Sequence, residues 1–258
     1  MTVSLERKGA IAVLTLDDPA RKNAMTPALG EALAARVDEL KGDASVRVVV
    51  LEGAGGAFSG GGDLAMLEQL RSVSREASKA FMLRFYASYL SILDLPVPTL
   101  AVVEGAAIGA GLCVALACDL VLVDEDAKLA VNFASLGLHP GMGATYLLPR
   151  RAGAQRAAEL LLTGRRFDGR AAASYGLALE AVSRSALHDR AMALAESLAK
   201  SAPLVTRALK RSLGVDRAAL AAALENEATE QAVSYASQDL GEGLRAVSEK
   251  RGAVFTGG

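Results

Sequence analysis

Two glycine-rich segments stand out as places where the protein backbone could do chemistry. Residues 53–62 and residues 104–111 each follow an apolar run typical of a buried strand and precede a helix. Glycine lets the backbone approach a ligand closely, and unpaired N–H groups at a helix start favour negative charge. Because both segments hold few polar side chains, two backbone amides could together stabilise an oxyanion or enolate. The alternative is that these glycines serve only tight turns.

Two further interpretations of the same segments are open. The glycines of 109–111 follow a strand, and Asp124 ends the next one, which imitates a dinucleotide-binding fingerprint. Against that interpretation, five residues separate the strand end from the first of these glycines. Residues 57–61 are similar to a nucleophile elbow, with His139 downstream as a base, but the first glycine of the elbow is missing. A lone histidine beside a proline is more often a turn or packing residue.

Alternating strands and helices must position these segments. Two strands, over 46–51 and 99–103, lack alternation and are therefore predicted to be buried on both faces. Further strands are predicted over 10–16, 120–123, 128–131 and 179–182. Helices are predicted over 27–41, 72–93, 110–117, 155–162, 169–175, 187–200, 204–213, 218–235 and 240–250, with Thr26 and Asp63 starting two helices. These elements divide into a strand-plus-helix core, residues 1–201, and a helical C-terminal region, residues 202–258.

Composition narrows the class of protein. The 258 residues include 28 basic and 29 acidic side chains, a balance that argues against a broad nucleic-acid surface. No apolar stretch is long enough to predict a membrane-spanning helix, and residues 1–10 lack the pattern of a secretory signal. Cys113 and Cys118 are the only cysteines, and the chain has only two histidines. These counts predict no disulfide framework and no metal site, and they suit a cytoplasmic protein.

Five segments in order give the chain a family resemblance. It resembles the crotonase, or enoyl-CoA hydratase/isomerase, superfamily over essentially its whole length. Residues 18–25 are similar to the family's R-P-x-x-x-N-A-L, 57–64 to A-F-C/S-A-G-A-D-L, 104–111 to N-G-x-A-x-G-G-G, 136–145 to L-G-x-x-P-G-x-G-G-T, and 249–255 to E-K-R-x-P-x-F. The order and spacing of these segments, more than any one of them, carry the resemblance.

The resemblance implies an α/β fold, a crotonase-like spiral of ββα units with an α-helical C-terminal trimerisation region. It implies a homotrimer or hexamer that binds an acyl-CoA thioester in fatty acid metabolism. Coenzyme A would enter as part of the substrate, with no permanently bound cofactor. The amides of Gly62 and Ala110 would form the oxyanion hole.

The resemblance also implies a set of substrate-binding positions. They are Lys22, Ala24, Ser59, Gly60, Gly61, Asp63, Leu64, Ile108, Gly109, Leu136, Gly141 and Lys250. Lys250 would approach a CoA phosphate; the alternative is that it is a solvated charge near the C-terminus. Aromatic residues at helical spacing, such as Phe81, Phe85 and Tyr86, suggest an apolar pocket but equally suit the core.

The chain departs from the hydratase pattern at the acid/base positions. Cys113 and Phe133 stand where family hydratases have two glutamates, and Gly141 stands at the place of the dehalogenase-type aspartate. Hydration needs a water activated between two carboxylates, which a thiol and a phenyl ring cannot replace. Other candidate acids or bases are Glu104, Glu68, His139 and Cys113 itself, each of which also has a structural interpretation. A lyase or isomerase using another group, a CoA-ester decarboxylase or hydrolase, and a non-catalytic acyl-CoA binder therefore remain as alternatives.

Overall fold

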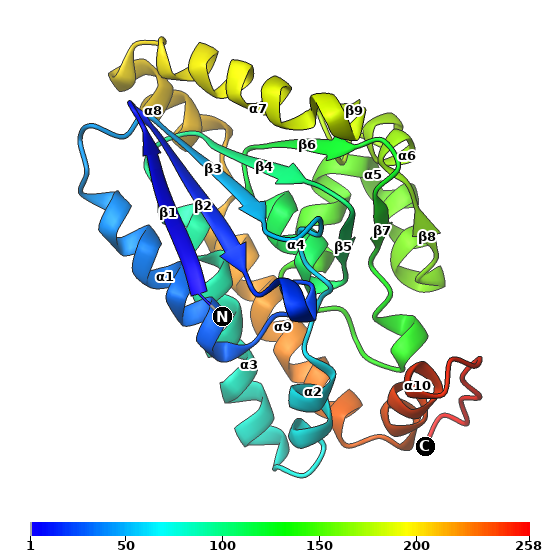
Figure 1. The fold of residues 1–258 in the computed structure, drawn as a ribbon. Coiled ribbons are helices and arrows are strands. Elements are labelled where there is room, and N and C mark those ends of the chain that lie inside the picture. The colour runs from blue at the N-terminus through cyan, green and yellow to red at the C-terminus, as the bar shows by residue number, and fades with distance from the viewer. Residues whose placement is uncertain (1) are drawn as a thin grey trace.

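A computed structural model describes residues 2–258 and contains a six-stranded sheet at its centre (Figure 1). Only the first pair of strands is antiparallel; every other neighbouring pair is parallel. In spatial order the strands are β1 (Thr2–Lys8), β2 (Ile11–Asp17), β3 (Val48–Gly53), β4 (Thr99–Val103), β6 (Leu120–Asp124) and β9 (Glu180–Val182). The parallel strands all end at the same edge of the sheet, which brings the segments that follow β3 and β4 together.

A second, three-stranded sheet lies beyond that edge. It contains β5 (Ala106–Ile108), β7 (Lys128–Ala130) and β8 (Arg166–Phe167), in that order. An isolated bridge between Ser59 and Ala107 ties the first glycine segment to β5. The small sheet therefore fixes the two glycine segments relative to each other.

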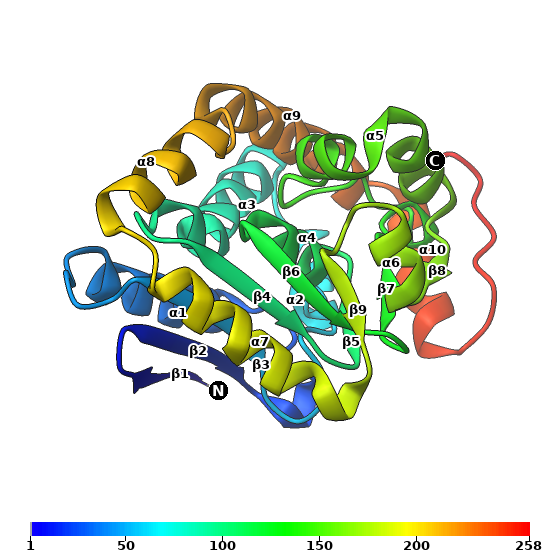
Figure 2. The same cartoon turned by 90° about the horizontal axis from the view of Figure 1, so that it is seen from above.

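Helices cover both faces of the large sheet (Figure 2). One face packs against α7, and the other packs against α1, α3 and α4, so the central strands are buried on both sides as predicted. The helices are α1 (Pro27–Lys41), α2 (Leu64–Leu70), α3 (Arg75–Leu90), α4 (Ala110–Ala117), α5 (Ala144–Thr163), α6 (Gly169–Ser174), α7 (Arg184–Ala199), α8 (Pro203–Leu213), α9 (Arg217–Tyr235) and α10 (Gln238–Ser248).

Local capping chemistry explains where several helices begin. The Thr26 side chain accepts a hydrogen bond from the Leu29 amide, and Asp63 accepts one from Met66, so both predicted helix starts are confirmed. The helix predicted over 72–93 is shorter, because Ser74 caps its start and its last turn tightens into a 3₁₀ helix over Ser91–Asp94. The sequence prediction missed β1, β5 and β8.

The helical region that follows residue 202 does not form a separate layer. Helix α9 lies alongside α3, and Tyr235 shares the main core with residues of both sheets. The division into 1–201 and 202–258 stays a prediction. Helix α8 instead leaves a row of apolar side chains uncovered, with exposed fractions between 51% and 82%: Leu204, Val205, Leu209 and Leu213.

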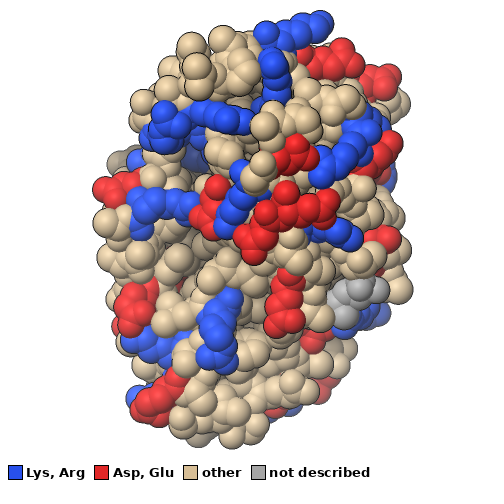
Figure 3. Space-filling view, turned by 90° about the vertical axis from the view of Figure 1, so that its left-hand side faces the viewer, with Lys and Arg blue, Asp and Glu red and all other residues tan. Residues whose placement is uncertain are grey.

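Charged side chains of both signs interleave on the face that carries β1 and α1 (Figure 3). Arg7 on β1 pairs with Glu39 and Asp43, and Arg36 pairs with Glu39. Because β1 is an edge strand, this charged border discourages pairing with another strand. Within residues 2–258, no helix is long and apolar enough to cross a membrane.

Candidate functional site

A cavity of about 440 Å³, open to solvent on one side, lies between the glycine segments and the helices α3, α9 and α10. Most of the predicted binding positions line it: Lys22, Gly60, Gly61, Gly62, Leu64, Ile108, Gly109, Ala110, Leu136 and Gly141. Ala24, Ser59, Asp63 and Lys250 do not. Among residues 2–258, no aspartate or glutamate lines the cavity, and no group of three potential metal ligands occurs.

Buried polar side chains hold the first glycine segment in place. Asn23 donates hydrogen bonds to the carbonyls of Ala54 and Ala57, and Ser59 Oγ donates to the Asn23 carbonyl. The Gly60 amide donates to the Lys22 carbonyl at 2.7 Å. Asn23 and Ser59 therefore do not touch the ligand space but shape the loop that borders it.

Two backbone amides that border the cavity lack an internal acceptor. Gly109 has φ +55° and ψ −121°, a conformation that favours glycine, and it turns the chain from β5 into α4. Ala110 is the first residue of α4, where no side chain caps the helix. In residues 2–258, neither the Ala110 N–H nor the Gly62 N–H donates a hydrogen bond. Both are free to donate to a ligand oxygen.

The two positions where family hydratases carry glutamates differ from each other in this structure. Phe133 lines the cavity, whereas Cys113 is completely buried in the core and does not line it. Burial raises the pKa of the Cys113 thiol well above its ordinary value. A neutral thiol in this position fills space and is unsuited to act as a nucleophile or base.

The other candidate acids and bases lie away from the cavity. Glu104 accepts a hydrogen bond from Arg184 Nε at 2.6 Å, and Glu68 pairs with Arg71 at 2.7 Å on the surface. The His139 ring lies against the neighbouring Pro140 carbonyl. None of these side chains lines the cavity, so the structure brings none of them to the two free amides.

A polar cluster that sequence reasoning did not identify reaches the cavity from α3 and α9. The Tyr86 hydroxyl donates to Gln231 Oε1 at 2.6 Å, and Tyr235 Oη lies 3.4 Å from the same oxygen. Gln231 Nε2 donates to the His139 carbonyl at 2.9 Å. All three side chains line the cavity, although each is at most 2% exposed. The sequence pointed to Tyr86 only as one of several aromatic residues that suit either a pocket or the core, and it gave no signal that separates Gln231 and Tyr235 from core residues.

The absence of a side chain at Gly141 makes room for this cluster. A Cβ atom on Gly141 would lie 2.5 Å from Tyr86 Oη and 2.6 Å from Gln231 Nε2, both far inside contact distance. The phenol and the amide therefore occupy the space into which a side chain at position 141 would point.

Glu227 anchors the turn that contains Gly141. Its buried carboxylate accepts hydrogen bonds from the Gly143 amide at 2.7 Å and from the amide and hydroxyl of Thr145 at 2.8 and 2.6 Å. Burial raises the Glu227 pKa, while these hydrogen bonds act in the opposite direction. At the start of α5 the carboxylate also faces the positive end of the helix dipole.

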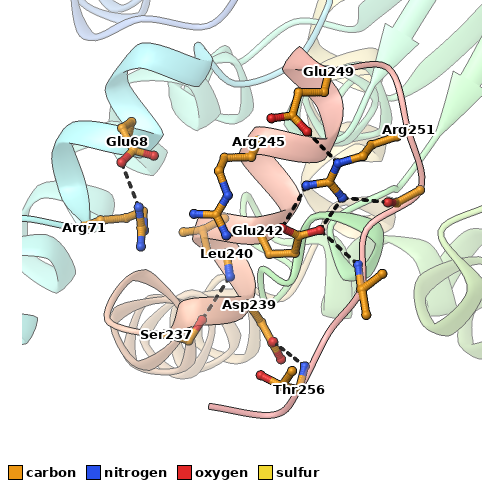
Figure 4. A network of polar contacts seen from close by, with 12 residues as sticks. Glu68, Arg71, Ser237, Asp239, Leu240, Glu242, Arg245, Glu249, Arg251 and Thr256 are labelled. Atoms are coloured by element: carbon orange, nitrogen blue, oxygen red, sulfur yellow. Dashed lines mark hydrogen bonds and ion pairs between the residues drawn. The ribbon is translucent and has the colours of Figure 1, made fainter.

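Helix α10 closes one side of the cavity through Val247 and is tied to the C-terminal tail (Figure 4). Glu242 pairs with Arg251, and Asp239 accepts hydrogen bonds from the amides of Thr256 and Gly257. Hydrogen bonds from Arg251 are the largest cause that lowers the pKa of Glu242, to about 2.

Three cationic side chains border the cavity without ion-pair partners. They are Lys22, Lys128 and Arg166, and in residues 2–258 no carboxylate lies within ion-pair distance of any of them. Lys128 and Arg166 come from neighbouring strands of the small sheet and are exposed. They give the mouth of the cavity a positive charge.

Comparison with known proteins extends these observations. A family model described as enoyl-CoA hydratase/isomerase matches residues 6–258. A Thermus thermophilus protein with enoyl-CoA hydratase in its name is 37% identical over 254 residues, covering 96% of this chain and 98% of its own. The mouse mitochondrial enoyl-CoA hydratase domain-containing protein 2 is 34% identical, covering 96% of this chain and 84% of its own.

Solved structures show the same architecture. OdaA from Pseudomonas aeruginosa superposes with a TM-score of 0.85 at 31% identity, covering 95% of this chain and 98% of its own. An enoyl-CoA hydratase from Bacillus halodurans superposes with a TM-score of 0.88 at 27% identity, covering 95% and 100%. The predicted α/β spiral is thus confirmed.

Proposed function

This chain belongs to the enoyl-CoA hydratase/isomerase family, and from that premise we propose that its cavity binds an acyl-CoA thioester and stabilises the enolate of that thioester. The observation that carries the proposal is the pair of free amides, Gly62 N–H and Ala110 N–H, on one cavity. The uncompensated cations Lys22, Lys128 and Arg166 at its mouth suit the phosphates of coenzyme A.

The two amides would act on the thioester oxygen. An α-hydrogen leaves as a proton and an α-carboxylate leaves as carbon dioxide. In either case the electron pair of the broken bond moves toward the carbonyl, and the thioester oxygen gains negative charge. Two N–H groups already oriented toward that oxygen stabilise the charge without reorganisation, and one such donor is typically worth about 10²–10³ in rate. No bound metal or permanent cofactor is part of this proposal.

Hydration of an enoyl group is not the reaction we propose. Among residues 2–258, no carboxylate lines the cavity, and burial raises the pKa of Tyr86 well above its ordinary value, so the phenol stays protonated. A protonated phenol cannot take a proton from water, so this cavity has no side chain that could activate water as a base at neutral pH in the described residues. We therefore expect hydration of crotonyl-CoA to be weak or undetectable while binding persists.

Decarboxylation of a CoA ester is the reaction that the neutral cavity favours. When the bond to the α-carboxylate breaks, carbon dioxide leaves and the electron pair of that bond forms the enolate. A proton from water then adds to the α-carbon, so no protein base is needed. A hydrolase would still need activated water, for which the cavity offers no carboxylate. A non-catalytic acyl-CoA binder would show binding without turnover of any thioester.

Assembly belongs to the same proposal. The uncovered apolar side chains of α8, among them Leu204 and Leu213, suit contact with a second copy of the chain. We propose a homotrimer or hexamer acting in the cytoplasm. Light scattering at micromolar concentration should give a trimeric or hexameric mass, and a monomeric mass would contradict the assembly.

Calorimetry with butyryl-CoA, crotonyl-CoA and NAD tests the ligand class. We expect dissociation constants of about a micromolar for the thioesters, or roughly −8 kcal/mol, and no heat with NAD. Turnover assays on methylmalonyl-CoA and crotonyl-CoA then separate decarboxylation from hydration. Binding of NAD without binding of a thioester would overturn the proposal and restore the dinucleotide interpretation.

A further inference from the structure

The inner wall formed by Tyr86 and Gln231 has hydrogen-bonding capacity that the protein itself does not use. We propose that these two residues are specificity residues that recognise a neutral oxygen, hydroxyl or keto, on the acyl chain of the thioester. This inference rests on the proposed function, because it requires an acyl-CoA in the cavity. It concerns which acyl groups the cavity prefers.

The orientation of the Gln231 amide follows from its partners. The His139 carbonyl can only accept, so the group facing it must be the NH₂, and Gln231 Nε2 lies 2.9 Å away. That leaves Oε1 to accept from the Tyr86 hydroxyl at 2.6 Å. One proton of Nε2 is used, and in residues 2–258 the second has no acceptor.

The Tyr86 hydroxyl has one fixed hydrogen-bond partner, because its proton points to Gln231. The Met142 backbone acts to lower the Tyr86 pKa, against the larger effect of burial. One lone pair on the phenol oxygen remains. The unused amide proton and this lone pair are neighbours, because both atoms lie within 2.6 Å of the position that a Gly141 Cβ would take.

This pair of groups matches a neutral oxygen better than the alternatives. A ligand hydroxyl can donate to Tyr86 and accept from Gln231, and a keto oxygen can accept from Gln231. A plain alkyl chain leaves the buried amide proton unpaired, which weakens binding. A ligand carboxylate would lose its hydration among Met82, Phe85 and Leu138, with the cations at the exposed mouth instead.

Calorimetry with three thioesters of equal chain length tests the inference: butyryl-CoA, racemic 3-hydroxybutyryl-CoA and acetoacetyl-CoA. We expect the unmodified protein to bind both oxygenated thioesters about tenfold more tightly than butyryl-CoA, which corresponds to about 1.4 kcal/mol. Gln231→Leu should abolish both preferences, and butyryl-CoA should bind to it at least as tightly as to the unmodified protein, because no amide proton is then left unpaired.

Two variants of tyrosines on α3 sharpen the test. Tyr86→Phe should remove most of the hydroxyl preference but keep the keto preference, because the Gln231 amide remains. Tyr89→Phe is the matched control: its buried hydroxyl donates to the Thr26 carbonyl at 2.8 Å, and it does not line the cavity. It should leave all three affinities unchanged. If Gln231→Leu fails to fold, the Tyr86→Phe comparison decides.

Equal affinity of the unmodified protein for the three thioesters overturns this inference while leaving the proposed function intact. A preference for the oxygenated thioesters that survives in both Gln231→Leu and Tyr86→Phe also overturns it. If none of the three thioesters binds, the proposed function fails together with the inference.

Discussion

The cavity has two walls that work by different chemistry. One is built from loops, and its working groups are the backbone amides of Gly62 and Ala110. The other is built from the helices α3 and α9, and its working groups are the side chains of Tyr86 and Gln231. The first wall is built on the glycine motifs that carry the family resemblance, whereas the second presents a neutral phenol and a neutral amide.

This difference separates what binds the thioester from what selects the reaction. A backbone amide is the same whatever chemistry follows, so the loop wall suits any thioester whose oxygen gains charge. Side chains on helices can change without disturbing the loops. A change at the helical wall should therefore alter the reaction or the acyl preference while binding of coenzyme A persists.

Placing carboxylates at positions 113 and 133, opposite the free amides in the family pattern, should have the largest effect. We expect the double variant Cys113→Glu with Phe133→Glu to raise crotonyl-CoA hydration by about 10²–10⁴, because two carboxylates would act on one water. Steady-state assays measure this gain against each single variant. A double variant no better than its better single variant would contradict the cooperation of the two positions.

That experiment needs a check on folding. Cys113 is completely buried, so a glutamate there places a charge in the core. Circular dichroism and butyryl-CoA binding should match those of the unmodified protein before hydration rates are compared.

Removing one amide from the loop wall should have the next largest effect. Ala110→Pro deletes the N–H at the first position of α4, where proline suits the helix. We expect turnover of the thioester that the enzyme processes to fall about 10²–10³-fold, with little change in stability. Ala110→Ser keeps the N–H and is the control. Unchanged turnover in the proline variant would remove Ala110 from the oxyanion hole.

Loosening the turn behind the helical wall should destabilise the protein. Glu227→Ala leaves the amides of Gly143 and Thr145 without their buried acceptor, and we expect a loss of about 2–4 kcal/mol in denaturant unfolding. Thr229, on the same helix, is exposed and donates only to the Glu225 carbonyl, so Thr229→Ala is a mild control. A loss no larger than that of the control would mean that Glu227 does not anchor the turn.

The smallest effect we expect is that acid loosens the contact between α10 and the C-terminal tail. The Glu242 pKa falls from its ordinary value of 4.5 to about 2 in the folded state, chiefly through hydrogen bonds from Arg251. A lowered pKa means that the ion pair stabilises the folded state above pH 4.5 and that this contribution is lost between about pH 4.5 and 2.

Hydrogen exchange in 238–258 measures that release. We expect exchange to accelerate across this pH window relative to the sheet strands. Glu242→Gln should show the faster exchange already at neutral pH. Identical exchange in the variant and the unmodified protein at neutral pH would contradict the role of this ion pair.

The sequence predicted the features that depend on backbone geometry. The buried strands and the helix starts at Thr26 and Asp63 follow from apolar runs and capping side chains, and the structure confirms them. The glycine segments likewise predicted that backbone amides could work there, whereas the choice of the Gly62 and Ala110 amides came from the family resemblance and stays a prediction.

The same reasoning could not find the second wall. Tyr86 and Gln231 are 145 positions apart, and their pairing depends on α9 lying along α3. Among apolar neighbours at helical spacing, each resembles a core residue, and neither position carries a local motif. Glu104 and Glu68 were candidate acids or bases because they are carboxylates near the motifs. The structure pairs them with Arg184 and Arg71 on the surface, and the sequence could not predict these pairs.

The position of the second wall along the chain has a consequence for synthesis. Gln231 and Val247 leave the ribosome after every strand of both sheets, since the last strand ends at Val182. A nascent chain can therefore assemble its sheets and glycine loops while the cavity is still open on one side. An open, apolar cavity with two unpaired amides is a surface that a chaperone could hold, and the arrival of α9 and α10 would end that interval.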